Sequence, residues 1–333
     1  MGHELTWGLP VILYLFLAGV GAGAVTVSSS TLLRGGSGIF GGSHFTMARY
    51  GALIGPIPVM LGTFLIVFEL GRPFRMMNLF KVINLSPMNI GSWLLMLFIF
   101  ASLLYAIAFL PTLFPQLKRL SERLNTARKA LAWINVPLGV GVAVYTGVML
   151  GAMPARPLWN SPILAMLFLV SALSTGVAVI TLSQTLFHRK SPDVETDRRV
   201  QARRTTGRIG RRHRESGYVL TTFDLILIGI EIMVIFLFLM FAHLTIGDMK
   251  YAIATILPGG EMAAMFWVGV VLIGLVMPAV IEAFYVMPKL LHHREFAAPR
   301  SVEIIVSIAV LIGGFMLRYV IVAAGQITGP VGL

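Results

Sequence analysis

The hydrophobic positions of this chain fall into eight long apolar runs, which are separated by polar connections. Each run has the roughly 20 apolar residues that an α-helix needs to cross about 30 Å of hydrocarbon. The runs lie at 7–32, 51–70, 90–111, 131–150, 161–185, 219–242, 264–287 and 301–324. The pattern predicts an all-α integral membrane protein with eight transmembrane helices.

The basic residues are divided unequally between the connections. Twenty of the 26 Lys and Arg residues lie in four alternate connections, which start near residues 33, 112, 186 and 288. Cytoplasmic loops of membrane proteins accumulate Lys and Arg. We therefore predict that these four connections lie in the cytoplasm and that both termini lie outside, on the periplasmic side.

The overall composition agrees with a membrane protein and narrows its partners. Hydrophobic residues make up 57% of the protein and charged residues 12%, and the mean hydropathy is +0.85. Soluble domains have about 25% charged residues. The net charge of +12 is carried mostly by the predicted cytoplasmic connections, which favours contact with anionic membrane lipids and not with nucleic acid.

The runs divide into two predicted halves, residues 1–150 and residues 151–333, with four runs in each. The longest polar stretch is a predicted cytoplasmic loop at 186–217, which contains 10 basic residues. Its composition allows two interpretations. It is either a linker that contacts lipid headgroups or a docking site for a cytoplasmic protein.

The protein has no cysteine and seven histidines. Without thiolate ligands it cannot hold an iron–sulfur cluster. A transmembrane b-type haem needs paired histidines at membrane depth, and all seven histidines lie at or outside the ends of the predicted helices. We therefore expect no haem or iron–sulfur cluster on this chain. If the protein handles electrons, it takes them from an organic carrier and passes them to a cofactor on another protein.

Polar and aromatic residues gather at the predicted outer ends of the first-half helices. Glu69 and Arg72 are three residues apart, so they share a helical face. They form either an interfacial ion pair or part of a polar pocket with a proton exit. Tyr14, Tyr145 and Trp159 fit the aromatic belt of a membrane protein, but they also fit an aromatic cleft for a quinone headgroup, whose carbonyls need hydrogen-bond donors.

The second half carries ionisable residues at membrane depth, where they are costly and therefore candidates for function. Asp224 and Glu231 are seven residues apart on one helical face. Glu282 lies in the next run, Glu303 begins the last run, and Arg318 lies further along it. Two interpretations remain open: an ion pair between an acid and Arg318 that holds the helices together, or a series of groups that conducts protons from the cytoplasm.

Five stretches, in order and at matching spacing, carry a resemblance to a known family. They are WGLPVILYLFLAGVGAG, FELGRPFRMMNLF, SPMNIGSWLLM, YTGVMLGAMPARPLWNSPILAMLFLVSALSTG and GGFMLRYVIVAAGQ. With them the whole chain resembles the NrfD/PsrC family, the integral-membrane, quinone-binding subunits of complexes of the polysulfide reductase type.

The resemblance implies eight helices in two four-helix bundles, in the cytoplasmic (inner) membrane of a bacterium or archaeon. It also implies menaquinol or ubiquinol bound near the outer face, beside a ferredoxin-like partner that carries [4Fe–4S] clusters. That partner connects to a molybdopterin subunit or to a multihaem cytochrome. By position, the quinone pocket of the family maps onto Tyr14 and Tyr145.

These observations favour an electron-transfer subunit. Tyr145 would hydrogen-bond one quinone carbonyl, Glu69 would relay a proton, and Arg72 would orient Glu69. If the acids of the second half supply protons from the cytoplasm, turnover would also translocate protons. The alternatives are a secondary transporter, or a structural membrane anchor without a quinone site.

Overall fold

A computed structural model describes most of the chain. The described residues are 7–35, 41–69, 86–114, 116, 118–187, 199–292 and 299–328. Within these ranges, the side chains at 41–43, 69, 118, 121–122, 199–217 and 289–292 are not described. The described residues form helices and no strand, and eight of these helical segments are long and apolar enough to cross a membrane. The prediction of an all-helical protein with eight such segments is confirmed.

The first half contains four of the eight candidate spans. Its helices are α1 (Leu9–Arg34), α2 (Gly41–Ile54), α3 (Pro56–Glu69), α5 (Pro87–Phe109), the 3₁₀-helix η2 (Leu110–Thr112), α6 (Lys118–Arg123) and α7 (Asn125–Gly151). The second span, His44–Phe68, comprises α2 and α3. These two helices meet at Gly55 because Pro56 lacks an N–H and its ring opposes a continuous helix.

The second half contains the other four candidate spans. Its helices are α8 (Pro162–Phe187), α9 (Arg199–Leu244), α10 (Asp248–Ile253), the π-helix η4 (Met265–Val276), α11 (Met277–His292) and α12 (Arg300–Ile327). Helix α9 has 46 residues and begins inside the segment that the sequence predicts as a loop. Hydropathy misses this part because Arg, Gln and Ala favour a helix without being apolar as a group.

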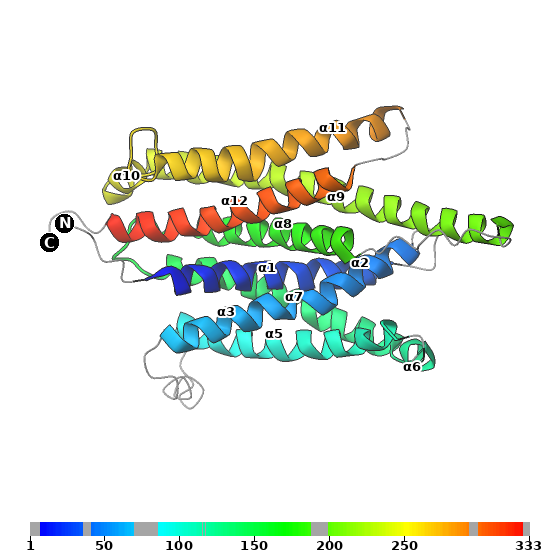
Figure 1. Ribbon diagram of the computed structural model, residues 1–333. Coiled ribbons are helices and arrows are strands. Elements are labelled where there is room, and N and C mark those ends of the chain that lie inside the picture. The colour runs from blue at the N-terminus through cyan, green and yellow to red at the C-terminus, as the bar shows by residue number, and fades with distance from the viewer. Residues whose placement is uncertain are drawn as a thin grey trace.

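Helices α1 and α8 lie at the centre of the structure, and the other spans surround them (Figure 1). In the most apolar 18 residues of α1, 78% are buried, and in those of α8, 67%. The two backbones approach closely because a Cβ at Gly23 would collide with the carbonyl of Ala172. Small residues permit such contacts between membrane helices. This supports the helix-packing interpretation of Gly23.

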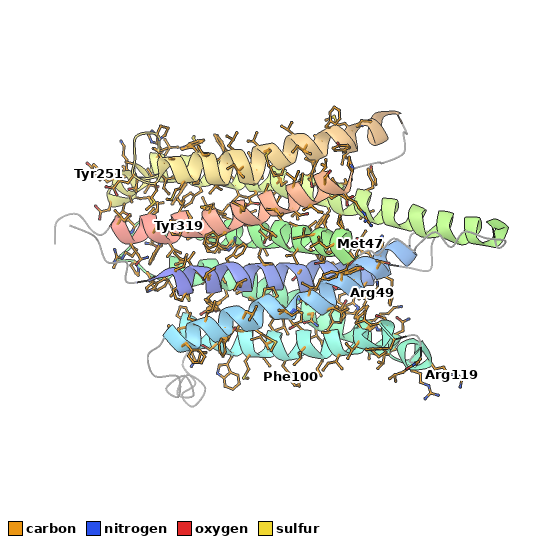
Figure 2. All side chains as sticks on the ribbon, viewed as in Figure 1. Met47, Arg49, Phe100, Arg119, Tyr251 and Tyr319 are labelled. Carbon is orange, nitrogen blue, oxygen red and sulfur yellow. The ribbon has the colours of Figure 1, made fainter. Side chains whose placement is uncertain are left out.

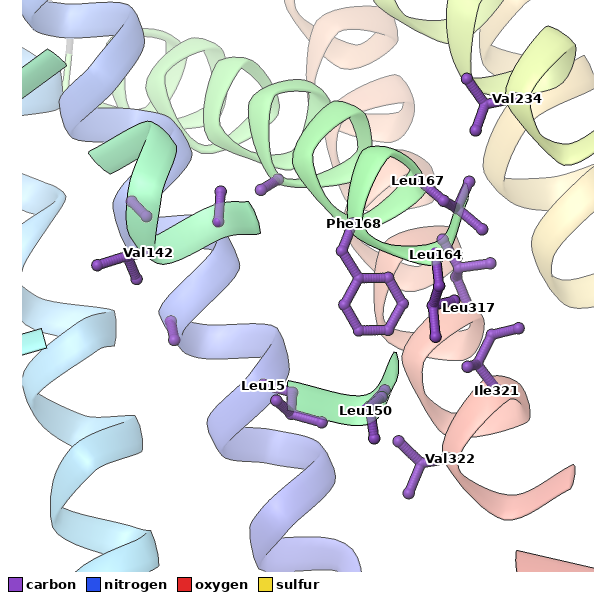
Figure 3. Packing of buried hydrophobic residues seen from close by; sticks show 14 of the residues in the cluster. Leu15, Val142, Leu150, Leu164, Leu167, Phe168, Val234, Leu317, Ile321 and Val322 are labelled. Atoms are coloured by element: carbon purple, nitrogen blue, oxygen red, sulfur yellow. The ribbon is translucent and has the colours of Figure 1, made fainter. Parts of the chain in front are cut away.

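The apolar side chains are divided between a core and an outward-facing surface. Figure 3 shows the core where α1, the end of α7, α8 and α12 meet. Its labelled residues are Leu15, Val142, Leu150, Leu164, Leu167, Phe168, Val234, Leu317, Ile321 and Val322. On the outside, Phe100 of α5 points away from the neighbouring helices and is 64% exposed (Figure 2). Exposed side chains of this kind suit contact with lipid.

The start of α1 and the end of α12 lie together at one end of the structure (Figure 1). The backbone N–H of Trp7 donates to Oε1 of Gln326 at 2.7 Å, and Nε2 of Gln326 donates to the carbonyl of Trp7 at 3.2 Å. Arg156, between α7 and α8, donates to the carbonyl of Gln326 at 2.7 Å. That this end faces the periplasm, and that the helices divide into two four-helix bundles, stay predictions.

Candidate functional site

Tyr14 of α1 and Tyr145 of α7 lie close enough for their phenol groups to interact electrostatically. Both residues are buried. The Tyr145 ring lies over Gly91 of α5, where any Cβ would collide with it. Its hydroxyl donates to Sδ of Met149 at 3.5 Å. A thioether is a weak acceptor, so the Tyr145 hydroxyl remains available to a stronger one.

The position of the Tyr145 ring depends on a local sequence feature of α5. This helix begins after Ser86, whose hydroxyl accepts a hydrogen bond from the backbone N–H of Asn89 at 3.3 Å, and Pro87 stands in its first turn. The cap fixes where the helix starts. Gly91 then leaves the space that the Tyr145 ring fills. The requirement for glycine at this place is visible only in the three-dimensional contact.

Trp159 is buried by a different set of contacts. Its Nε1 donates to the carbonyl of Ile321 at 2.8 Å, and its ring lies against Gly325 of α12. The centroid of its ring is 5.2 Å from that of Trp7. The indole N–H is therefore already paired with the backbone of α12, and its role in binding a quinone stays a prediction.

The predicted roles of Glu69 and Arg72 fall on parts of the protein that are not described. Glu69 is the last residue of α3, and its side chain is outside the described set. Arg72 lies within 70–85, which is outside the described residues altogether. Both residues keep their predicted roles without a structural test.

The acids of the second half meet around a cavity between α8, α9, α11 and α12. Asp224 of α9, Glu282 of α11 and Glu303 of α12 line it. The other lining residues are Thr181, Thr221, Ile281, Tyr285, Val302, Val306 and Ser307. The cavity encloses about 350 Å³ of space between atoms, and none of its lining residues is basic. The structure thus brings together acids that the sequence placed on three separate helices.

Hydroxyl groups hold two of these three carboxyls. Ser174 of α8 donates to Oδ1 of Asp224 at 2.9 Å, and Thr185 of α8 donates to Oε2 of Glu303 at 2.9 Å. Glu282 differs from them, because its Oε2 is buried and has no hydrogen-bond partner among the described residues. A buried polar atom without a partner is costly. The Glu282 carboxyl therefore points to water or a proton in the cavity.

Arg318 is completely buried between α1, α8 and α12. Its Nη1 donates to Oγ of Ser171 at 3.1 Å and to the carbonyl of Gly314 at 2.7 Å. The side chain of Ser171 also hydrogen-bonds Glu231, and Glu231 and Arg318 attract each other. A serine hydroxyl thus connects the acid of α9 to the arginine of α12. Both interpretations of these charges, as an ion pair and as part of a proton path, remain compatible with this contact.

Sequence reasoning missed the hydroxyl residues and Arg128. Ser171 and Ser174 are three apart on α8 and face the same neighbours as Glu231 and Asp224, but small polar residues are too common in apolar helices to attract notice. Arg128 counted as a loop residue. In the structure it is buried in α7, where its Nε donates to the carbonyl of Ala108 at 2.9 Å. Among the described residues, no group of three or more His, Cys, Asp or Glu is arranged to hold a metal ion.

Comparisons with known proteins agree over nearly the whole chain. The protein NrfD of Escherichia coli is 28% identical over 340 residues, which are 98% of this chain and 96% of that protein. A membrane-complex component named as a polysulfide reductase polypeptide in Wolinella succinogenes is 28% identical over 97% of this chain and 95% of its own length. A polypeptide named as part of the selenate reductase of Mesobacillus selenatarsenatis is 23% identical over 55% of this chain and 48% of its own length.

The family model described as "Polysulphide reductase, NrfD" matches residues 1–203 and 202–330. These matches cover both predicted halves, including the tyrosine pair of the first half and the acids of the second. The chain therefore belongs to the polysulphide reductase NrfD family.

Proposed function

We propose that this protein is the membrane subunit of a respiratory oxidoreductase complex, and that it exchanges electrons between the quinone pool and an iron–sulfur partner. The observation that carries the proposal is the tyrosine pair. Tyr14 and Tyr145 interact across α1 and α7, and the Tyr145 hydroxyl is held only by the weak acceptor Met149 Sδ. Two of the relatives are parts of reductases by name, which supports a role in such a complex.

The residues of this region fit a quinone headgroup. The quinone, as menaquinol or ubiquinol, would supply the redox chemistry, in which two electrons and two protons leave the quinol. The Tyr145 hydroxyl would donate a hydrogen bond to one carbonyl oxygen, with Tyr14 as the second polar group. Apolar walls with a few placed donors are typical of sites for such ligands. Glu69 would accept a proton, with Arg72 orienting it.

The electron acceptor in this proposal belongs to another protein. A protein without cysteine cannot ligate an iron–sulfur cluster. The partner would be a ferredoxin-like subunit with [4Fe–4S] clusters on the outer side of a bacterial or archaeal inner membrane. Through it, electrons would reach a molybdopterin subunit or a multihaem cytochrome. The chemistry at the terminal substrate would take place there.

The second half would supply the proton path of the same complex. Glu303, Glu282, Asp224 and Glu231 come from three helices and follow one another from the predicted cytoplasmic end toward Arg318. Hydroxyl groups of α8 connect to three of these acids. Carboxyls and hydroxyls at hydrogen-bond spacing are the groups that proton paths in membranes use. We propose that this series delivers protons from the cytoplasm.

Tyr145→Phe tests the quinone site, because it removes only the hydroxyl. We expect quinol-dependent turnover of the complex to fall about tenfold, which corresponds to the loss of one hydrogen bond of about 1.4 kcal/mol. Turnover that a soluble dye drives through the partner should not change. The matched control is Tyr105→Phe, since Tyr105 is also buried but bonds to Ser28 in a different part of the first half.

Two results would remove the quinone assignment from this tyrosine. One is an equal loss of quinol-driven and dye-driven turnover, which would indicate damage to the whole complex. The other is a quinol-driven rate for Tyr145→Phe that matches the rate for Tyr105→Phe.

A further inference from the structure

The polar series of the second half stops before it reaches the outer end of the helices. At 1.5 Å per residue, Glu303 lies about 5 Å into α12 and Asp224 about 9 Å into its span, which begins at Tyr218. Glu231 lies about 20 Å into the same span. Arg318 is nine residues before the end of α12, so about 14 Å of helix remains beyond it.

The inner part of the series is suited to protons. The cavity at Asp224, Glu282 and Glu303 leaves about 20 Å³ for the centres of water-sized molecules, which is enough to hold water. The partnerless Oε2 of Glu282 marks a place for such a water. From there, Ser174 holds Asp224, and Ser171 links Glu231 to Arg318.

The surroundings of Arg318 change from polar to apolar on the side of α1. Its guanidinium carbon lies 5.8 Å from the centre of the Phe16 ring and 5.3 Å from that of Phe168. A Cβ at Gly19 of α1 would lie 2.7 Å from its Nη2. Nη2 and Nε have no partner among the described residues. The residues that follow on α12 toward the outer end are Val320, Ile321, Val322, Ala323 and Ala324, all buried.

A buried arginine at this place is an electrostatic barrier. Its guanidinium keeps its proton, so it does not pass protons on as a carboxyl does. Fixed positive charges exclude protons from water-filled pores by the same effect. The barrier is strong here because the surroundings have a low dielectric constant.

We propose that Arg318 closes the outer end of a half-channel that begins at Glu303 and passes Glu282, Asp224 and Glu231. This inference rests on the proton path proposed above and adds the residue that prevents leakage. Protons from the cytoplasm reach Glu231 and stop there, because the link through Ser171 holds the Arg318 guanidinium beside it. Passage beyond Arg318 requires that this link is broken during turnover.

Passive proton flux through liposomes tests the proposal without any quinol. The purified complex is placed in vesicles with an entrapped pH-sensitive dye, and a potassium diffusion potential drives protons. Wild-type protein and Arg318→Lys, which keeps the charge, should stay tight. Arg318→Gln should leak at least about tenfold faster, which is the effect of lowering the barrier by 1.4 kcal/mol. Arg318→Gln combined with Glu231→Gln should be tight again, because the series is then interrupted.

Arg128→Gln is the matched control. Arg128 is also a buried arginine, but it lies in α7 against Phe109 and away from the acids. A leak in this control equal to that of Arg318→Gln would indicate general damage and overturn the proposal. A tight Arg318→Gln would overturn it as well, and so would a double variant that leaks as much as the single one.

A second neutral variant covers the case in which Arg318→Gln does not assemble. Arg318→Met places a flexible apolar side chain between Phe16 and Phe168, where it fits without a charge. If it leaks, the proposal stands. If neither neutral variant assembles, Arg318 is required for packing and the proposal fails. The outcome is independent of the quinone site, because Tyr145→Phe is measured by turnover and the leak is measured without quinol.

Discussion

At the scale of single residues, Trp159 illustrates how one residue can serve packing and still be a candidate for binding. Its indole N–H donates to the carbonyl of Ile321, and its ring fills the space left by Gly325. The contact connects the segment between α7 and α8 to the end of α12. A donor that is already paired in the buried interior contributes to stability first.

We expect Trp159→Phe to destabilise the protein by about 1–3 kcal/mol, because the carbonyl of Ile321 loses its buried partner. The measurement is the apparent melting temperature in detergent, followed by circular dichroism. Trp133→Phe is the control, since Trp133 is 70% exposed on α7. Unchanged melting together with a loss of quinol-driven turnover would contradict the packing role and favour direct contact with the quinone.

The candidate site shows which residues a sequence can indicate and which it cannot. Asp224 and Glu231 were recognisable because ionised groups are rare at membrane depth and a spacing of seven places them on one helical face. The meeting of Glu282 and Glu303 with Asp224 depends on how three helices pack. The hydroxyl of Ser171 carried no signal, because serine in an apolar helix has many neutral explanations.

At the scale of helices, the close contact of α1 with α8 organises the centre of the structure. Gly23 touches the backbone at Ala172, and a Cβ at Gly176 of α8 would collide with the backbone of Gly23 and Ala24. Contacts between glycine surfaces replace the hydrophobic effect as the force between helices in lipid. The contact leaves no room for a larger residue at either glycine.

Gly23→Val should therefore destabilise the packing of α1 against α8 by at least about 1–3 kcal/mol, the usual cost of an overpacked core. The measurement is the yield of monodisperse protein in size-exclusion chromatography after mild solubilisation. Gly229→Val is the control, because a Cβ at Gly229 of α9 meets nothing within 4 Å. Equal yields for the two variants would show that the α1–α8 contact tolerates a separation.

The positions of the helices were predictable, but several of their details were not. Apolar runs of about 20 residues identify spans because the bilayer fixes their length. Hydropathy does not indicate the hydrogen-bond pattern, so the π-helix at Met265–Val276 was unforeseen. It also does not recognise a charged helix, which is why the start of α9 at Arg199 was assigned to a loop.

At the scale of the whole molecule, the two candidate sites lie on opposite sides of α1. Tyr14 packs toward α3 and α7, whereas Gly19 contacts Arg318 of α12. Electron exchange at the tyrosines and proton entry at the acids would therefore be separate in space. Coupling between them would pass through α1, which contacts both sets of helices.

Glu231→Gln should lower the number of protons translocated per electron in vesicles without blocking quinol-driven electron flow. The reason is that glutamine keeps the size of the residue but cannot carry a proton in exchange. The control is Glu261→Gln, since Glu261 is exposed between α10 and η4. An unchanged ratio would remove the acid series from energy conservation and leave it with the role of an internal ion pair.

The central position of α1 has a consequence for how the protein is made. A protein is synthesised from its N-terminus, so α1 enters the membrane before α8 and α12, against which it is buried. Arg318 arrives with the last of the eight candidate spans. A nascent polypeptide thus holds Asp224, Glu231 and Glu282 before the residue that closes their path. Insertion of α12 completes the core and, under the proposal above, seals the membrane in the same step.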